Sequence, residues 1–262
     1  MENNTIRSIF SIREAFRFAW MKLKTSWKVL VPATIILLII SALFSRQPMG
    51  ETSISMDILQ FIWSILQIFI SMGFAYIGIR IARNEEVGWK HFLVPKTRFW
   101  KYLGASILFA LPIVLLFIVI LAIFAGAFFA GGGMMSGLAT IGTAAGIAFV
   151  VAIGLSLWYM SVFYFYQYIV VDQNKKPVQA LKEAARMTKG SRRKLVVVTI
   201  LLIAFNVVGA ILAFAGLIIT MPMTIIILAY IYEKLRMHAN GESAEFPIVQ
   251  PKEILAPETT TS

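Results

Sequence analysis

Two histidines are the main candidates for metal or acid–base chemistry in this sequence. The chain has only His91 and His238, and it has no cysteine. A zinc site combines three or four His, Cys or acidic ligands, and neither histidine has a second ligand candidate at metal-like spacing. Phosphate-binding loops, dinucleotide-binding fingerprints and nucleophile elbows are also missing from the sequence. We therefore expect no metal, no cofactor and no catalytic residue, and a protein that is not an enzyme.

Two amides stand out because they interrupt long apolar segments. Gln67 lies within the uncharged stretch 58–79, and Asn206 lies within the uncharged stretch 195–232. An amide surrounded by hydrocarbon is expected to bond to another helix, which contributes about 1 kcal/mol. We interpret both amides as contacts between helices; the alternative is that they line a pathway for a solute. Because no ionisable carboxylate lies inside these stretches, ion-coupled transport is not expected.

Membrane-spanning helices would have to position these residues. The chain is 59% hydrophobic and 14% charged, whereas soluble domains have about 45–50% apolar and about 25% charged residues. Four stretches carry no charge, namely 29–45, 58–79, 102–171 and 195–232. A membrane helix needs roughly 20 apolar residues, so the last two stretches are too long for one helix each. The third has a Gly-rich centre and the fourth contains Pro222, so each is expected to form two helices.

The sequence thus predicts an all-α integral membrane protein with six transmembrane helices, paired as three hairpins, and amphipathic cytoplasmic helices at the interface. The expected spans are about 27–45, 57–80, 102–129, 142–171, 195–219 and 222–235. The membrane domain would cover 1–237. Residues 238–262 contain several Pro and Glu residues and are expected to form a disordered cytoplasmic tail.

Lys and Arg are distributed very unevenly between the connections. Of the 24 basic residues, 23 lie at the N-terminus, in the second and fourth connections or in the C-terminal tail, and only Arg46 lies elsewhere. Basic residues concentrate on the cytoplasmic side of membrane proteins. We therefore expect both termini to be cytoplasmic in a multi-pass protein of the bacterial cytoplasmic membrane. The net charge of +11 then indicates anionic lipid as a partner and not nucleic acid.

Three similar junctions precede the first, third and fifth spans. They read TSWKVL at 25–30, TRFWKYL at 97–103 and GSRRKLV at 190–196. The residues expected to contact lipid headgroups are Trp27, Lys28, Trp100, Lys101, Arg193 and Lys194. Amphipathic segments precede the first and third junctions, and a shorter one precedes the second. This order predicts an internal repeat whose junctions lie at one membrane depth and contribute equally to lipid binding; the alternative is independent anchoring of three helices at the interface.

The segment FYQYIVVDQNKKPVQALKEAARMTKGSRRKLVVVTILL at 165–202 and SIREAFRFAWMKLKTSWKVL at 11–30 resemble a bacterial membrane superfamily. That superfamily is similar to the membrane domain found beside glycerophosphodiester phosphodiesterases. The matching positions are Ala180, Leu181, Ala184, Thr188, Lys189 and Gly190. The resemblance implies six helices and no agreed activity, because the soluble catalytic part of those enzymes has no counterpart here.

Small residues recur every four positions in the fourth span. Ala144, Ala148, Ala152 and Ser156 form this row, and such rows let helices approach closely. We expect the fourth span to be central in the bundle, or to contact a second copy of the chain or another membrane protein. The function expected is a non-enzymatic membrane protein that organises the bilayer or acts as a lipid-interacting scaffold. The alternative is a small uncoupled transporter or export component, with a pathway lined by Gln67 and Asn206.

Overall fold

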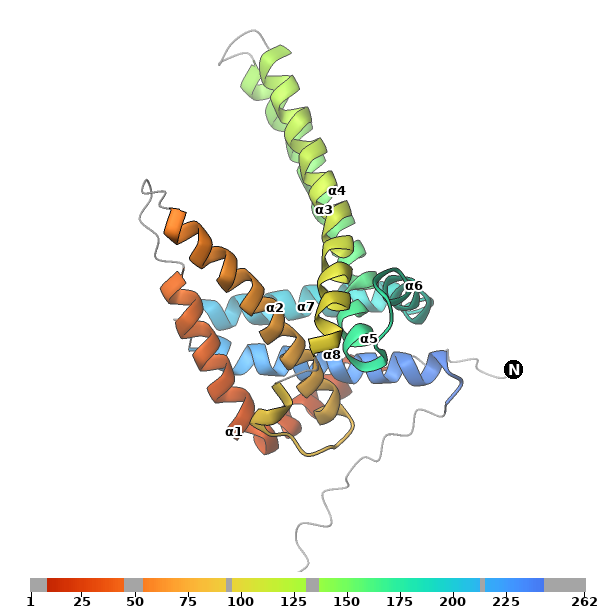
Figure 1. Cartoon of the computed structure of the whole chain (residues 1–262). Helices are drawn as coiled ribbons and strands as arrows, with labels where there is room; N and C mark the ends of the chain where they lie inside the picture. Colours follow the sequence, from red (N-terminus) through yellow and green to blue (C-terminus); the bar gives the residue numbers. More distant parts are fainter. Residues whose placement is uncertain (1–8, 45–53, 93–95, 131–136, 213–214, 243–262) are drawn as a thin grey trace, which may run out of the picture.

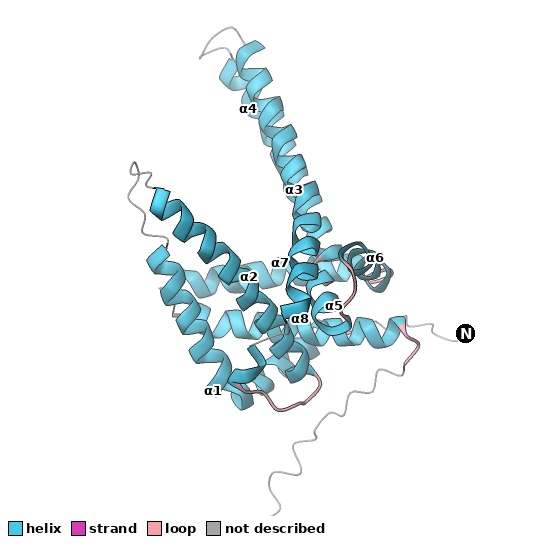
Figure 2. Cartoon of the chain, viewed as in Figure 1, coloured by secondary structure: helices cyan, strands magenta, loops and turns pink. Residues whose placement is uncertain are grey.

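A computed structural model describes residues 9–44, 54–92, 96–130, 137–212 and 215–242 of the chain. Within these ranges every element of regular structure is a helix (Figure 2). Six of the helices are long and apolar enough to cross a membrane. The all-α membrane class predicted from the sequence is therefore confirmed.

Nine helical segments follow one another in the described part of the chain. They are α1 (Ile12–Phe44), α2 (Ile54–Ala82), the one-turn 3₁₀ helix η1 (Trp89–Phe92), α3 (Lys96–Ala130), α4 (Gly137–Phe163), α5 (Tyr166–Gln173), α6 (Pro177–Met187), α7 (Arg192–Ile211) and α8 (Leu217–Ala239). The short helices η1, α5 and α6 lie between the long ones in the chain. Figure 1 shows them gathered at one end of the molecule, which we call the base.

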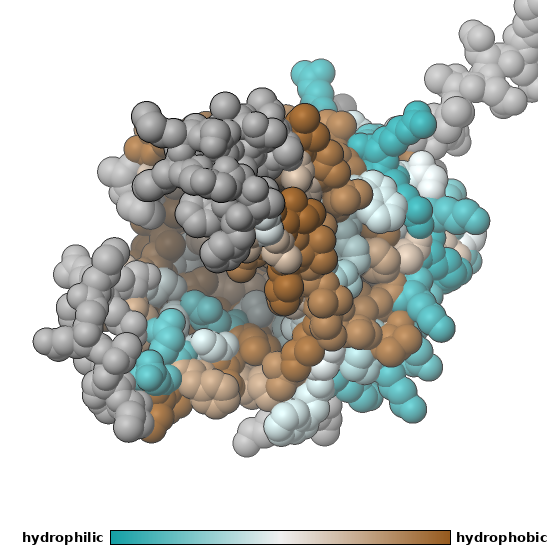
Figure 3. All heavy atoms as spheres, turned by 90° about the horizontal axis from the view of Figure 1, so that it is seen from above, coloured by the Kyte–Doolittle hydropathy of each residue, from teal (hydrophilic) through white to brown (hydrophobic). Residues whose placement is uncertain are grey.

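The long helices leave the base in consecutive pairs. In Figure 1, α3 and α4 run side by side and project away from the other helices, and α7 and α8 also lie side by side. The first pair diverges more, and its contact lies near the end of α1, where Phe44 stacks on Trp63 with ring centroids 4.8 Å apart. Seen from above, the surface is hollowed beside the α3–α4 pair, and hydrophilic side chains gather along the opposite edge (Figure 3).

The first transmembrane segment differs from the expected arrangement of a membrane-lying helix, a hinge and a separate span beginning near residue 27. In the structure all of these residues form the single 33-residue helix α1. Its early turns contact α8, where the Tyr230 hydroxyl donates to the Glu14 carboxylate at 2.7 Å. Pro32 lies inside the helix, where it removes one backbone hydrogen bond without ending the helix. The amphipathic segment and the span are thus continuous.

The break between the last two spans falls before Leu217 and not at Pro222, as the sequence had suggested. Pro222 is the sixth residue of α8, so the helix loses one hydrogen bond there and continues. Two glycines explain the actual position. A Cβ at Gly216 would lie 2.6 Å from the carbonyl oxygen of Gly209, so only a residue without a side chain fits this close approach of α7 and α8. The expected fourth span is also divided, because a turn at Tyr164–Phe165 separates α4 from α5.

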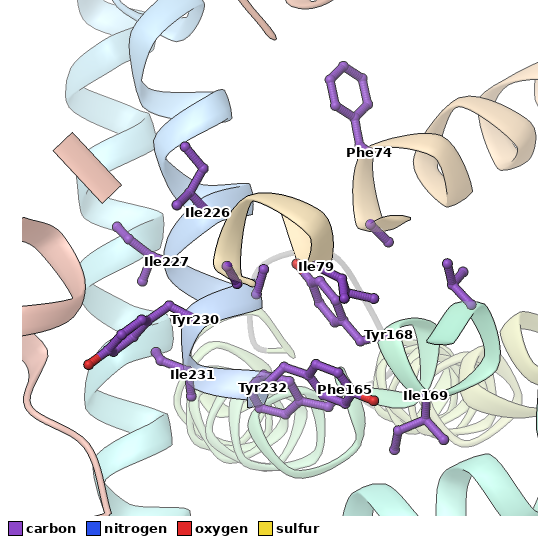
Figure 4. Packing of buried hydrophobic residues seen from close by; sticks show 14 of the residues in the cluster. Phe74, Ile79, Phe165, Tyr168, Ile169, Ile226, Ile227, Tyr230, Ile231 and Tyr232 are labelled. Atoms are coloured by element: carbon purple, nitrogen blue, oxygen red, sulfur yellow. The ribbon is translucent and has the colours of Figure 1, made fainter. Parts of the chain in front are cut away.

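Among the six candidate spans the most buried helix is α8, and not α4 as the small-residue row had suggested. Most of the spanning part of α8 is buried, whereas few residues of α4 are. On α4, Ala152 is buried, but a Cβ at Gly146 or Gly154 would meet nothing within 4 Å. The described part of α4 contacts mainly its neighbours α3 and α7, so α4 is not central in the bundle, and contact of the row with a second copy stays a prediction. Figure 4 shows the core at the base, where Tyr232 of α8 stacks on Tyr168 of α5 with ring centroids 5.5 Å apart.

Candidate functional site

A cluster of charged side chains joins three helix ends at the base. Arg83, just after α2, donates from Nε to Glu233 Oε1 of α8 at 2.8 Å and from a terminal nitrogen to Asp172 Oδ2 of α5 at 2.7 Å. Arg236 donates to the other oxygen of Glu233 at 3.0 Å. The Glu233 side chain is only 1% exposed. We call these four residues the base clamp.

Neutral groups complete the hydrogen bonding of the base clamp. The Tyr232 hydroxyl donates to Asp172 Oδ2 at 2.9 Å and accepts from the Gln173 amide at 3.0 Å. Partial burial works to lower the pKa of Arg83, but hydrogen bonds and attraction from Asp172 and Glu233 outweigh it and raise this pKa above its usual value. Arg83 therefore stays charged at every physiological pH and holds the two carboxylates together.

The predicted headgroup residues differ in how free their side chains are. Trp27 is 53% exposed and Trp100 is 73% exposed, and both are large aromatic side chains without burial to hold them. Lys28 and Arg193 are exposed, and neither makes an ion pair or hydrogen bond with any residue that the structure describes. These four side chains can contact a membrane surface without giving up an internal partner.

The other two predicted headgroup residues bind the protein itself. The Lys101 ammonium donates to the main-chain and side-chain oxygens of Asn174, each at 3.1 Å. The Lys194 ammonium donates to the Phe10 carbonyl and lies 4.6 Å from the centre of the Phe10 ring. The three junction lysines are therefore not equivalent, because only Lys28 lacks such a contact among the described residues.

The two contacts of the junction lysines follow one pattern. Asn174 lies three residues before α6, and Phe10 lies two residues before α1. Each lysine lies in the first two turns of a long helix, Lys101 in α3 and Lys194 in α7. Each holds the turn that leads into an amphipathic segment, which is α6 for Lys101 and the start of α1 for Lys194. This pattern was not visible in the sequence, because the partners lie 73 and 184 residues away from the lysines.

The two mid-span amides lie in different surroundings. The Asn206 amide on α7 donates to Thr224 Oγ1 on α8 and to the Leu202 carbonyl, both at 2.8 Å. This is the contact between helices that the sequence predicted for it. Gln67 on α2 is exposed and forms no hydrogen bond with any part of the chain that the structure covers. Its side chain lines a cavity of about 590 Å³.

A protein family matches the chain over almost its whole length. The family is described as a domain of unknown function (DUF7847), and the match covers residues 10–256. The chain belongs to this family. No curated protein and no solved structure matches the chain.

For this DUF7847 chain, the base clamp is the feature that the sequence analysis missed. From the sequence, the charged residues of the base clamp would be expected in solvated cytoplasmic segments and not in contact with one another. A signal for it does exist, because the dipeptide Tyr-Ile occurs once in each of the three helices that the base clamp joins, α2, α5 and α8. The three copies are Tyr76–Ile77, Tyr168–Ile169 and Tyr230–Ile231. All three isoleucines are fully buried, which indicates that the three helix ends converge.

The described part of the DUF7847 chain contains no group of three His, Asp or Glu residues that could hold a metal ion. His91 instead accepts a hydrogen bond from the Gly88 amide on its Nδ1 at 2.9 Å, which stabilises the turn leading into η1. His238 lies in the last turn of α8.

Proposed function

We propose that this protein is a non-enzymatic multi-pass protein of the bacterial cytoplasmic membrane that binds anionic lipid at the base and organises the surrounding bilayer. The observation that carries the proposal is the pairing of exposed tryptophans with exposed basic side chains on α1. Trp20 is 47% exposed with the Lys24 ammonium 5.2 Å from its ring centre, and one to two turns further on Trp27 is exposed beside Lys28.

Such pairs favour the boundary between lipid and water. Tryptophan rings partition to the headgroup level, and each Lys or Arg near an anionic surface contributes about 1 kcal/mol of binding free energy. Exposed basic residues recur near the beginning of the other hairpins, including Lys90, Lys189 and Arg193. With the base on the cytoplasmic side, these charges would face the leaflet that carries anionic lipid.

The proposal includes an internal repeat of three units, each made of a segment at the base followed by a hairpin. The Tyr-Ile copies at the three helix ends support it, and so do the matching contacts of Lys101 and Lys194. Parallel repeats of this kind are related by an axis along the membrane normal. The likeness to the membrane domain beside glycerophosphodiester phosphodiesterases belongs to the same proposal, and it carries no phosphodiesterase activity to this chain.

The second candidate function is a small uncoupled transporter or export component. The cavity beside Gln67 favours it, because a solute pathway needs an open space within the membrane. The pairing of Asn206 with Thr224 argues against it, because one of the two amides proposed to line the pathway is already bonded to a neighbouring helix. We therefore rank lipid binding first.

The orientation is tested by single cysteines, since the chain has none of its own. In intact cells, an impermeant maleimide is expected to label a Cys at Gly50 and to leave a Cys at Lys182 unlabelled until the membrane is opened. The reason is the concentration of 23 of 24 basic residues on one side. Strong labelling of Lys182→Cys from outside would reverse the orientation and remove the basis for cytoplasmic lipid binding.

The lipid contact is tested by removing exposed charges. The triple variant Lys24→Gln, Lys28→Gln, Arg193→Gln is expected to lose roughly 3 kcal/mol of binding to phosphatidylglycerol at low salt, at about 1 kcal/mol for each charge. The remaining binding should respond less to salt, because exposed charges are screened over about 10 Å at 0.1 M. Native mass spectrometry with defined lipids measures both effects.

The matched control removes the two internally bonded junction lysines. Lys101→Gln with Lys194→Gln is expected to lower the melting temperature more than it lowers lipid retention, since these ammonium groups bind Asn174 and Phe10. Unchanged phosphatidylglycerol retention in the triple variant would leave Trp27 and Lys28 as simple helix anchors.

A further inference from the structure

We propose that the cavity beside Gln67 binds an uncharged membrane lipid whose small head carries hydroxyl or carbonyl oxygens, such as a diacylglycerol. The cavity has a volume of about 590 Å³, within the range of about 300–1,000 Å³ that is usual for small-molecule sites. It lies where α1, α2, α8 and the turn between α4 and α5 face one another. Its apolar wall includes Leu37 and Leu38 of α1, Phe74 of α2 and Ile225 of α8.

Most polar groups of the cavity come from α2 and from the region of the α4–α5 turn, and Ser41 contributes from α1. Ser64, Gln67 and Ser71 line it from α2, and Tyr164 and Gln167 line it from the opposite turn and from α5. Gln167 accepts a hydrogen bond from the Tyr102 hydroxyl at 3.0 Å, so its side chain is held in place. The amide of Gln67, in contrast, forms no hydrogen bond with any described residue, through either its N–H donors or its oxygen. An amide without a partner is unfavourable in hydrocarbon, so an occupant that hydrogen-bonds to it would be stabilised.

The absence of charge among the lining residues selects the class of lipid. No Lys, Arg, Asp or Glu lines the cavity within the described part of the chain. Gln67 lies 15 residues before the end of α2, which corresponds to about 22 Å along the helix axis. A phosphate group at that depth would be unpaired and far from water, which is strongly unfavourable. A hydroxyl or ester group can instead accept or donate a single hydrogen bond to the amide, while the chains lie along the apolar wall.

In a neighbouring cavity the polar lining side chains are already hydrogen-bonded to one another. It has a volume of about 420 Å³ and lies between α4, α7 and α8. Its polar residues pair across the helices, because Ser161 donates to Thr199 at 3.1 Å and Asn206 donates to Thr224 at 2.8 Å. The Asn206 amide thus has a protein partner, whereas the Gln67 amide has none among the described residues. Asn206 therefore provides a matched control for Gln67.

The site is independent of the proposed contact between the basic base and anionic lipid. It uses no basic residue and lies deeper in the membrane. Failure of one proposal therefore leaves the other intact, provided that both lipids are measured on the same protein samples.

The test uses the full chain in nanodiscs that contain a trace of a photoactivatable diacylglycerol with its reactive group near the glycerol. After illumination, labelled peptides are mapped and quantified by mass spectrometry. We expect the label to concentrate on 64–75 of α2 and 221–225 of α8. Gln67→Leu should lower this labelling about five-fold. Ser64→Phe, which fills the cavity from a side chain that bonds only to the Gln60 carbonyl of its own helix, should lower it at least ten-fold.

The control Asn206→Leu should keep wild-type labelling, and phosphatidylglycerol retention should be unchanged in all three variants. If Ser64→Phe does not fold, the proposal is tested by Gln67→Leu and by competition, in which unlabelled diacylglycerol is expected to reduce the labelling of the wild type. The proposal is overturned if Gln67→Leu labels like the wild type. It is also overturned if the label spreads evenly over the exposed faces of α3 and α4, or if a photoactivatable phosphatidylglycerol labels the same peptides equally well.

Discussion

Replacing Arg83 by methionine is expected to destabilise the protein by about 3–5 kcal/mol, the usual effect of removing one partner from a buried ion pair. Arg83 binds two carboxylates, and one of them, Glu233, is almost completely buried. Without the guanidinium, Glu233 keeps only Arg236, and Asp172 keeps only the Tyr232 hydroxyl. Two negative charges then face each other at the centre of the base, and the ends of α2, α5 and α8 lose the group that joins them.

The control for this prediction is Arg80, three residues earlier, in the last turn of α2. Arg80 pairs with Glu85 at 3.3 Å, and the Glu85 side chain is 41% exposed, in contrast to the buried Glu233. Arg80 also donates to the Glu86 carbonyl at 3.2 Å. A pair with an exposed carboxylate contributes about 0–1 kcal/mol, so Arg80→Met should destabilise the protein clearly less than Arg83→Met. Thermal unfolding of purified protein in one detergent compares the two variants directly. Equal melting temperatures for Arg80→Met and Arg83→Met would show that the base clamp does not hold the helix ends together.

The class of the fold could be predicted from the sequence because it depends on local properties of the chain. Charge-free stretches of about 20 residues are long enough to span a bilayer wherever they occur. The helix α6 was predicted for the same kind of reason. Pro177 is its first residue, and Gly190, with φ of +92°, follows its end in a conformation that favours glycine. Neither feature requires knowledge of what lies on the other side of the molecule.

The candidate site depended on contacts between distant parts of the chain, and sequence reasoning found it only in part. Nothing near Lys194 in the sequence indicates that it binds the carbonyl of Phe10, 184 residues away. Glu233 follows an uncharged stretch and has the sequence context of a solvated residue, although its partner Arg83 lies 150 residues earlier. For Asn206 the reasoning succeeded, because an amide in an apolar helix is stabilised by a partner on another helix, here Thr224. For Gln67 the predicted contact between helices was wrong within the described residues, because its side chain lines a cavity. The shape of the space beside a helix depends on the packing of the other helices, which the sequence of α2 does not reveal.

The boundary between α7 and α8 illustrates a competition between two local signals. Proline is the stronger helix breaker in a sequence pattern, yet Pro222 lies near the start of α8, where the lost hydrogen bond affects only the first turns. The close approach of Gly209 and Gly216 decides the position of the turn. A sequence pattern alone does not distinguish a glycine that permits such an approach from one with open space beside it, such as Gly154.

This distinction leads to the second prediction with a large effect. Gly216→Ala is expected to destabilise the protein by about 1–3 kcal/mol, the usual effect of overpacking. A Cβ at this position would lie 2.6 Å from the Gly209 carbonyl oxygen and 2.7 Å from the Gly209 Cα. Both are backbone atoms, so no side-chain rotation can relieve the clash. The start of α8 would have to move away from α7, which would also strain the bond between Asn206 and Thr224.

The matched control is Gly154→Ala in α4, where the added Cβ would meet nothing within 4 Å. Alanine is favoured over glycine inside a helix by about 1 kcal/mol, so this variant should be as stable as the wild type or more stable. The two substitutions add the same methyl group, and only the space around it differs. Opposite shifts in the melting temperature are therefore expected. If both variants shifted it in the same direction by similar amounts, the Gly209–Gly216 contact could not be what fixes the turn, and Pro222 would again be the better explanation for where α8 begins.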